Sequence, residues 1–212
     1  MGRGAPGRGA LADSQLVPPT LAEAWARQVH SSRCVVARPG DCGEADALRL
    51  EQEGIAATIA TADCLPVVVV GTRAAVAIHA GWRGLAAGVI ESAIAALAGE
   101  RDEGPLAAWI GPAIGACCYE VGDDVARQVA ATSSPEVVRS RPGGDRPRLD
   151  LQRAAEVQLR RAGVASVVRI EACTRCHEEW LWSYRRDGAR RGRNLAVVWR
   201  EAAVKELTTT RR

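Results

Sequence analysis

The chain has 212 residues, of which 47% are hydrophobic and 25% are charged. This composition is ordinary for a globular protein and excludes a disordered, collagen-like or disulfide-scaffold chain, while the length suits one domain with one continuous core. The net charge of +3 is too small to indicate nucleic-acid binding, and no apolar run approaches the ~18 residues of a membrane span.

Apolar periodicity divides the chain into short strands and helices. A leader rich in Gly, Arg and Pro is expected at 1–19, then a single domain over 20–204 and a C-terminal tail at 205–212. β-Branched runs predict strands at 55–61, 65–70, 74–79, 106–110, 167–172, 181–184 and 194–199. Helical periods predict helices at 84–97, 121–131 and 150–162. Turn residues at 187–193 predict a hairpin between the last two strands. Because strands and helices mix without strict alternation, the predicted fold class is α+β, with a mixed β-sheet core and flanking helices.

The seven cysteines indicate a reducing compartment. Their number is odd, and residues 1–12 contain arginines but lack the apolar stretch of a secretion signal. We therefore expect a cytoplasmic protein whose reduced thiols are available as metal ligands or nucleophiles.

Polar residues interrupt the buried strand sequence at two places. Asp63 and Cys64 stand between two apolar strands, and His79 ends the next strand before a glycine-containing turn. If these strands pair, the separation of 79 − 64 = 15 residues folds back and brings thiol and imidazole together across ~5 Å of sheet spacing. Such a pair is typical of a Cys–His dyad or a zinc site, with a buried structural pair as the third alternative. By itself, His30 gives no indication of a role.

Two further cysteine motifs need an interpretation. The C-x-x-C-H sequence at 173–177 matches the attachment pattern of a c-type haem, but the only methionine is Met1 and no export signal is present, so haem is excluded. The adjacent Cys117 and Cys118 point opposite ways if the backbone is extended, one toward the core and one toward a pocket.

Ordered sequence blocks between His30 and Trp199 resemble the family of YfiH and laccase-domain proteins. They are Q-V-H at 28–30, D-A at 46–47, T-A-D-C-L-P at 61–66, H-A-G-W-R-G at 79–84, W-I-G-P-A-I-G at 109–115, Y-E-V-G at 119–122 and S-Y-R-R-D at 183–187. Members have been described as purine nucleoside phosphorylases, as polyphenol oxidases and as a peptidoglycan editing factor. The resemblance implies a mixed-sheet α+β fold and a further N-terminal segment ahead of these blocks. It also places Cys173 and Thr174 near the pocket and leaves Cys176 and His177 as local variation, with at most weak, adventitious metal binding.

The resemblance implies a metal site made by His30, Cys64 and His79. Two nitrogens and one sulfur suit Zn²⁺, at distances of roughly 2.0–2.3 Å, and leave a fourth tetrahedral position for water or substrate. Copper fits less well, because three ligands without a second histidine-rich cluster are too few for a multicopper centre.

Charged residues in the matching blocks are candidates for the remaining roles. Asp63 is expected to act as a general acid or base, or to orient His79. Arg83 is the leading phosphate ligand, because a guanidinium beside glycines can bind an oxyanion through two bonds.

Three more charged residues are expected to bind substrate. Arg185 is a second candidate phosphate ligand, and Asp46 and Glu120 are expected to line the pocket, with capping or surface roles as the alternative. Trp82 either stacks on a base or packs in the core.

Together with these residues, the family resemblance implies a zinc-dependent purine nucleoside phosphorylase. It converts adenosine, inosine or methylthioadenosine and phosphate into free base and ribose 1-phosphate, with adenosine deaminase activity as a second reaction. Nucleoside and phosphate are the expected partners, without nucleic acid or membrane, and the expected assembly is a monomer or homodimer. The alternatives are a Cys64–His79 hydrolase or amidase acting on peptidoglycan precursors, a copper-dependent polyphenol oxidase, and a metal-stabilised binding module left by N-terminal truncation.

Overall fold

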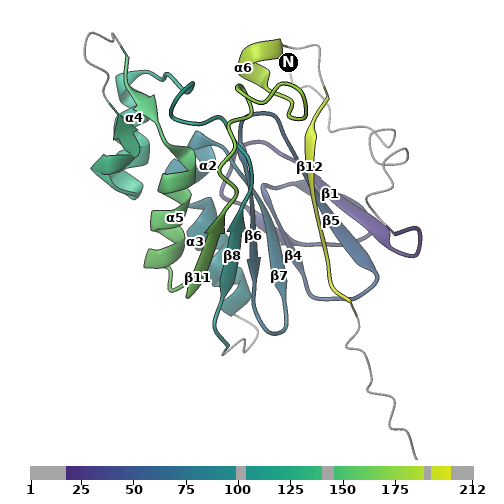
Figure 1. The fold of residues 1–212 in the computed structure, drawn as a ribbon. Helices are drawn as coiled ribbons and strands as arrows, with labels where there is room; N and C mark the ends of the chain where they lie inside the picture. Colours follow the sequence, from purple (N-terminus) through teal and green to yellow (C-terminus); the bar gives the residue numbers. More distant parts are fainter. Residues whose placement is uncertain (1–17, 99–103, 140–145, 189–191, 202–212) are drawn as a thin grey trace, which may run out of the picture.

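The computed structural model, which describes residues 18–98, 104–139, 146–188 and 192–201, has three layers of secondary structure (Figure 1). Helices cover one face of a six-stranded sheet, and a four-stranded sheet packs against the other face. The fold class is therefore α+β with mixed sheets, as predicted. One face of the six-stranded sheet is, however, covered by a second sheet rather than by helices. Apart from Pro18 and Pro19, the predicted leader at 1–19 and the tail at 205–212 lie outside the described residues.

The six-stranded sheet is mixed in direction. Its order is β11 (Ser166–Arg169), β8 (Ala107–Ile110), β6 (Leu65–Val70), β7 (Ala75–Ala80), β4 (Ala47–Leu50) and β2 (Cys34–Val36). Strand β6 runs antiparallel to β7 and β8, whereas the outer pairs β8–β11 and β4–β2 are parallel. Pro66 lies opposite His79 in the β6–β7 ladder, which confirms the predicted fold-back of these two strands.

The four-stranded sheet has the order β12 (Asn194–Trp199), β5 (Ile55–Thr61), β1 (Ala22–Arg27) and β3 (Gly40–Glu44). Strand β12 is antiparallel to β5, and the other two pairs are parallel. Strand β7 joins the two halves of the core, because successive side chains point to opposite faces. Val76 and Ile78 belong to the core beneath the helices, and Ala75 and Ala77 belong to the core between the sheets.

All three helices that the sequence predicts are present, one of them divided in two, and one further short helix was not predicted. They are α2 (Trp82–Ala86), α3 (Val89–Ala98), α4 (Asp123–Thr132), α5 (Leu151–Arg161) and the short α6 (Tyr184–Asp187), with a 3₁₀ turn at Pro135–Val137 and a small ribbon of β9 (Val138–Arg139) and β10 (Arg148–Leu149). The single helix predicted over 84–97 is two helices, because Gly88 adopts φ +80° between α2 and α3. Among the described residues, no helix is both long enough and apolar enough to cross a bilayer.

The predicted strand at 181–184 and its hairpin are wrong. Helix α6 begins at Tyr184, where the hydroxyl of Ser183 accepts the backbone N–H of Arg186. The side chain of Asn194 bonds both the N–H and the carbonyl of Trp182, at 2.9 Å each, so a side chain takes the place of a strand partner. Strand β12 pairs with β5 instead. The tip of the predicted hairpin, 189–191, lies outside the described residues.

Candidate metal centre

Three potential metal ligands converge between the two sheets. His30 follows β1, Cys64 precedes β6 and His79 lies in β7. Their ligand atoms all lie within 4.8 Å of one another. The Nε2 atom of His30 is 3.7 Å from the Sγ atom of Cys64, and the two imidazole rings meet edge to face with centroids 4.8 Å apart. The structure therefore brings together the three residues that the family resemblance implies as metal ligands. The cluster they form can hold a metal ion.

The carboxylate of Asp46 positions both histidines. Its Oδ1 atom lies 2.8 Å from Nδ1 of His79 and accepts the backbone N–H of His30 at 3.0 Å. Its Oδ2 atom accepts the backbone N–H and the hydroxyl of Ser31, at 2.6 and 2.8 Å. Because Nδ1 of His79 is occupied by Asp46, Nε2 is the nitrogen that faces the cluster. Asp46 has no exposed surface and lies behind the histidines. It therefore does not line a substrate pocket, contrary to the expectation from the sequence.

Two residues of the site have left-handed backbone conformations. His30 has φ +62° and Asp63 has φ +93°, values that cost a non-glycine residue about 1–3 kcal/mol. Hydrogen bonds hold each of them: His30 donates its N–H to Asp46, and the Asp63 carboxylate accepts two donors described below. The surrounding contacts therefore fix these conformations against an unfavourable local preference.

Two neighbours close the cluster. The side-chain amide of Gln28 donates to the carbonyl of Ala60 at 2.7 Å and accepts its N–H at 2.9 Å, which ties the segment before His30 to the end of β5. Gly81 approaches from the other side. A Cβ atom there would lie 2.7 Å from Cδ2 of His30 and 3.0 Å from Sγ of Cys64, so the position has no room for a side chain.

The electrostatics of the cluster favour a Cys64 thiolate beside a protonated His79. Burial by itself raises the pKa of the Cys64 thiol, but hydrogen bonds from His30 and His79 and the charges of the two histidines lower this pKa to about 6. Burial lowers the pKa of His79, whereas its hydrogen bonds to Asp46 and Cys64 raise it to about 9. The site therefore favours the charged form of the sulfur, which is the form that binds metals.

Asp63 organises the loop before α6 and does not contact His79. Its Oδ1 atom accepts the hydroxyl of Thr174 at 2.6 Å, and its Oδ2 atom accepts the backbone N–H of Arg185 at 2.6 Å. The expectation that Asp63 orients His79 is wrong, because Asp46 occupies that position. Asp63 instead joins the β6 end of the site to two segments that are distant in the sequence.

Arg185 and Tyr119 form the wall next to Asp63. The guanidinium of Arg185 lies 5.2 Å from the Tyr119 ring centroid and donates to the carbonyl of Glu120 at 3.1 Å. Burial raises the pKa of Tyr119 to about 12, and the charge of Cys64 acts in the same direction. The carboxylate of Glu120 pairs with Arg148 at 2.8 Å and is half exposed. Glu120 therefore contacts Arg185 through its backbone, and its side chain is engaged elsewhere.

Arg83 presents its charge at the start of α2. Its side chain is exposed, and the guanidinium lies 4.4 Å from the Trp82 ring centroid. Trp82 packs against the core beneath the helices, so its ring serves packing and supports Arg83. The charge of Arg83 acts on the Tyr119 phenol, as do the charges of Cys64 and Arg185. These groups therefore share one electrostatic environment.

The structure adds a residue that sequence reasoning missed. Ser31 binds the Asp46 carboxylate, whereas Thr174, which the resemblance places near the pocket, binds the Asp63 carboxylate. Ser31 follows directly after His30 of a matching block. A hydroxyl residue beside such a block is the available sequence signal.

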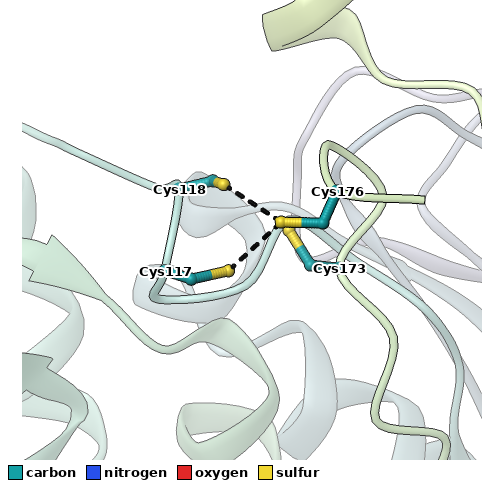
Figure 2. A group of neighbouring side chains, drawn as sticks. All are labelled: Cys117, Cys118, Cys173 and Cys176. Carbon is teal, nitrogen blue, oxygen red and sulfur yellow. Dashed lines mark hydrogen bonds between the residues drawn. The ribbon is translucent and has the colours of Figure 1, made fainter. Parts of the chain in front are cut away.

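The expectation that Cys117 and Cys118 point in opposite directions is wrong. The backbone is a turn here, since the N–H groups of Cys118 and Tyr119 both donate to the carbonyl of Gly115 at 2.9 Å. Both thiols approach Cys176, at 3.8 and 3.5 Å (Figure 2). His177 does not belong to this group, and its Nδ1 atom lies 3.4 Å from the carboxylate of Glu179.

The fold and the site define an α+β protein with a cluster of two histidines and one cysteine. A family model described as multi-copper polyphenol oxidoreductase laccase matches residues 8–201. The chain therefore belongs to this family of YfiH-type and laccase-domain proteins, as its sequence blocks predict.

Relatives and solved structures agree with this assignment. Purine nucleoside phosphorylase PA4543 of Pseudomonas aeruginosa is 41% identical over 182 residues, which cover 82% of this chain and 73% of the relative. Purine nucleoside phosphorylase YfiH of Escherichia coli is 34% identical over 180 residues, covering 82% and 72%. The crystal structure of YlmD from Geobacillus stearothermophilus superposes with a TM-score of 0.80 at 30% identity, covering 87% of this chain and 75% of that one. Neisseria meningitidis protein NMB0706 gives 0.76 at 36% identity, covering 86% and 76%.

Proposed function

We propose that the chain is a zinc-dependent purine nucleoside phosphorylase. The observation that carries this proposal is the convergence of His30, Cys64 and His79, with ligand atoms within 4.8 Å of one another and Asp46 behind His79. Relatives that are 41% and 34% identical to this chain over the aligned residues are named purine nucleoside phosphorylases, which supports an enzyme of this class.

The donor atoms of the cluster fit zinc. Two imidazole nitrogens and a thiolate are preferred zinc ligands, and three protein ligands leave an open position, which is typical of catalytic zinc sites. When bound, the ion would supply Lewis acidity toward a substrate nitrogen or oxygen. A multicopper centre fits poorly, because the chain has three histidines and the third, His177, lies outside the cluster.

Phosphorolysis requires the protein to hold two substrates in line. The bond between C1′ and the purine nitrogen breaks, a phosphate oxygen bonds to C1′, and the proton of the phosphate passes to the released purine. We assign phosphate binding to Arg83, whose exposed guanidinium can form two parallel bonds to an oxyanion. Arg185 is the second cation; its guanidinium lies over the Tyr119 ring, and its backbone N–H donates to Asp63. Hydrolytic deamination of adenosine is the second reaction proposed for the same site.

Product analysis tests this function. The purified protein, incubated with adenosine, should release adenine and ribose 1-phosphate only when phosphate is present, and inosine in either case. Arg83→Ala should raise the KM for phosphate about tenfold or more, since bonds to charged groups contribute about 1.5–3 kcal/mol. Arg127→Ala, which removes an exposed arginine of α4, is the matched control and should leave this KM unchanged. Absence of all these products from zinc-loaded protein would refute the proposal.

The thiolate–imidazolium pair favours one other candidate function. In a cysteine hydrolase or amidase acting on peptidoglycan precursors, Cys64 would be the nucleophile and His79 its base. The two functions differ in their need for metal. Activity that survives chelation and is lost on alkylation of Cys64 supports the hydrolase. Activity that requires zinc, with Cys64 protected from alkylation by the ion, supports the phosphorylase.

We place this reaction in the cytoplasm. All seven cysteines are free in the structure, and a thiolate ligand needs a compartment that keeps thiols reduced.

A further inference from the structure

A second group of potential metal ligands lies outside the site described so far. Cys117 and Cys118 belong to the turn that follows β8, and Cys173 and Cys176 belong to the loop that follows β11. Strands β8 and β11 are parallel neighbours, so their carboxyl ends reach the same edge of the sheet. The ladder continues as a bridge between Ala113 and Cys173. The topology therefore brings two pairs of cysteines together from segments more than fifty residues apart in the sequence.

Two of the sulfur–sulfur distances match the spacing of a tetrahedral ion site. All four lie within 4.8 Å of one another. The Sγ atom of Cys176 is 3.8 Å from that of Cys117 and 3.5 Å from that of Cys118 (Figure 2). Zinc–sulfur bonds of about 2.3 Å place the corners of a tetrahedron about 3.8 Å apart. All four cysteines are free, and Cys176 approaches two thiols at similar distances rather than bonding one of them.

We propose that Cys117, Cys118, Cys173 and Cys176 bind a second zinc ion, which locks the two loops beside the His30–Cys64–His79 cluster. Four thiolates in a tetrahedron are a closed, structural zinc site. The sequence interpretation of Cys176 as local variation is revised accordingly, because its sulfur lies 3.8 and 3.5 Å from those of Cys117 and Cys118.

A backbone donor stabilises one of these sulfurs. The N–H of Gly115 donates to Sγ of Cys173 at 3.2 Å. The tight turn from Cys173 is closed by the N–H of Cys176, which donates to the Cys173 carbonyl at 3.1 Å. N–H donors stabilise a thiolate ligand and fix its direction.

Two guanidinium groups, which also pair with Glu120 and Asp187, bind the backbone of the turns that carry the cysteines. Arg148 donates to the carbonyl of Cys117. Arg186 donates to the carbonyls of Thr174 and Arg175, at 2.9 and 3.1 Å. Both turns that carry the cysteines are thus held by cations.

The proposed ion would connect residues that build the first site. Tyr119 follows Cys118 and lies under the Arg185 guanidinium, and Thr174 follows Cys173 and donates to Asp63. Fixing the two cysteine turns to each other therefore fixes the Tyr119 wall relative to Asp63. Two of the thiols, Cys117 and Cys176, are exposed, so the ion can enter from solvent.

Metal analysis of the full chain tests this site directly. Elemental analysis of zinc-saturated, desalted protein should give two zinc ions per chain, one for each ligand cluster. Cys176→Ala should remove one ion, and His30→Ala combined with Cys64→Ala should remove the other. Cys42→Ala removes a thiol outside both clusters and should keep both ions.

Cobalt provides a spectroscopic readout that does not depend on activity. The His30→Ala, Cys64→Ala protein loaded with Co²⁺ should show intense thiolate-to-cobalt charge transfer and tetrahedral d–d bands, and adding Cys176→Ala should abolish them. If Cys176→Ala protein fails to fold, the cobalt spectrum of the double variant decides by itself. One zinc per wild-type chain, lost in the double variant, would overturn the proposal. A disulfide among these four cysteines in freshly purified protein would also overturn it.

Discussion

One buried carboxylate determines the geometry of the first metal centre. Asp46 bonds the His79 ring directly and holds the backbone of His30 and Ser31 through the same side chain. Both histidines are therefore positioned by one residue that is not itself a proposed metal ligand. Partners of this kind orient a metal-bound imidazole and increase its basicity.

Replacing Asp46 should weaken metal binding while the ligands stay in place. Asp46→Asn leaves an amide facing backbone N–H donors, and we expect zinc affinity to fall about 10–100-fold. Competition with a chromophoric chelator measures this change. Asp150→Asn is the control, because Asp150 caps α5 through the Arg153 N–H and asparagine is an equally good cap. Equal affinities of the Asp46→Asn and wild-type proteins would show that Asp46 does not support the centre.

Metal binding should depend on pH through His79. The metal-free protein keeps His79 protonated up to a pKa of about 9, whereas Cys64 is already a thiolate above a pKa of about 6. Between these values zinc must displace the imidazolium proton, so its affinity should rise about tenfold per pH unit. Calorimetry in buffers of different ionisation enthalpy should count about one proton released per ion. An affinity that is flat from pH 7 to 8 would contradict the proposed protonation states.

The sequence indicates some of these residues better than others. Strand pairing alone predicts that Cys64 and His79 meet, because both flank apolar runs that fold back on each other. His30 has a left-handed backbone in a loop and shows no periodicity, so only the family resemblance indicates it. The role of Asp46 depends on hydrogen bonds across loops, which no local pattern encodes.

At the scale of elements, the turn between β7 and α2 sets the approach of the ligands. Gly81 occupies the space where a Cβ atom would meet His30 and Cys64. In this turn, Gly81 leaves room for the metal ligands. Arg83 follows two residues later and places its charge at the start of α2.

Gly81→Ala should therefore displace the ligands. The added methyl lies 2.7 Å from Cδ2 of His30, and we expect at least a tenfold loss of zinc affinity, in line with other perturbations that misalign a ligand. The matched control is Gly84→Ala in α2, where a Cβ atom has no neighbour closer than 3.4 Å and helix propensity favours alanine. Unaltered zinc affinity in Gly81→Ala would mean that the histidine and cysteine are not held against this glycine.

The elements themselves were predictable to different degrees. Strands β5, β6 and β7 are long apolar runs, and their buried positions follow from that pattern. No strand was predicted before residue 55, because β2, β3 and β4 are short, β3 reads Gly-Asp-Cys-Gly-Glu, and β1 reads Ala-Glu-Ala-Trp-Ala-Arg without a β-branched residue. Such strands form because a neighbour supplies the ladder, as β1 does for β3. The incorrect hairpin has a comparable origin, since the Asn194 side chain satisfies the backbone of Trp182.

At the scale of the whole molecule, the first metal centre connects the two sheets. His30 comes from the end of β1 in the four-stranded sheet, whereas His79 lies in β7 of the six-stranded sheet. An ion bound by both therefore joins the layers in addition to the apolar core between them.

Loading this centre should stabilise the folded chain. At zinc concentrations of 100 times Kd, mass action adds about 2.7 kcal/mol. For a chain of this length that amounts to an increase in Tm of about 5–10 °C. Differential scanning fluorimetry of chelated and zinc-loaded protein measures it, with His30→Ala as the variant in which the contribution of this centre disappears. An equal zinc-dependent shift in wild-type and His30→Ala protein would place the stabilising ion elsewhere.

Anomalous X-ray diffraction at the zinc absorption edge, from crystals of the zinc-saturated chain, tests the proposed centre most directly. We expect an anomalous peak roughly 2.0–2.3 Å from Nε2 of His30, Sγ of Cys64 and Nε2 of His79, with one coordination position not taken by protein. Crystals without a zinc peak among these three atoms would contradict the metal centre and the nucleoside chemistry proposed for it.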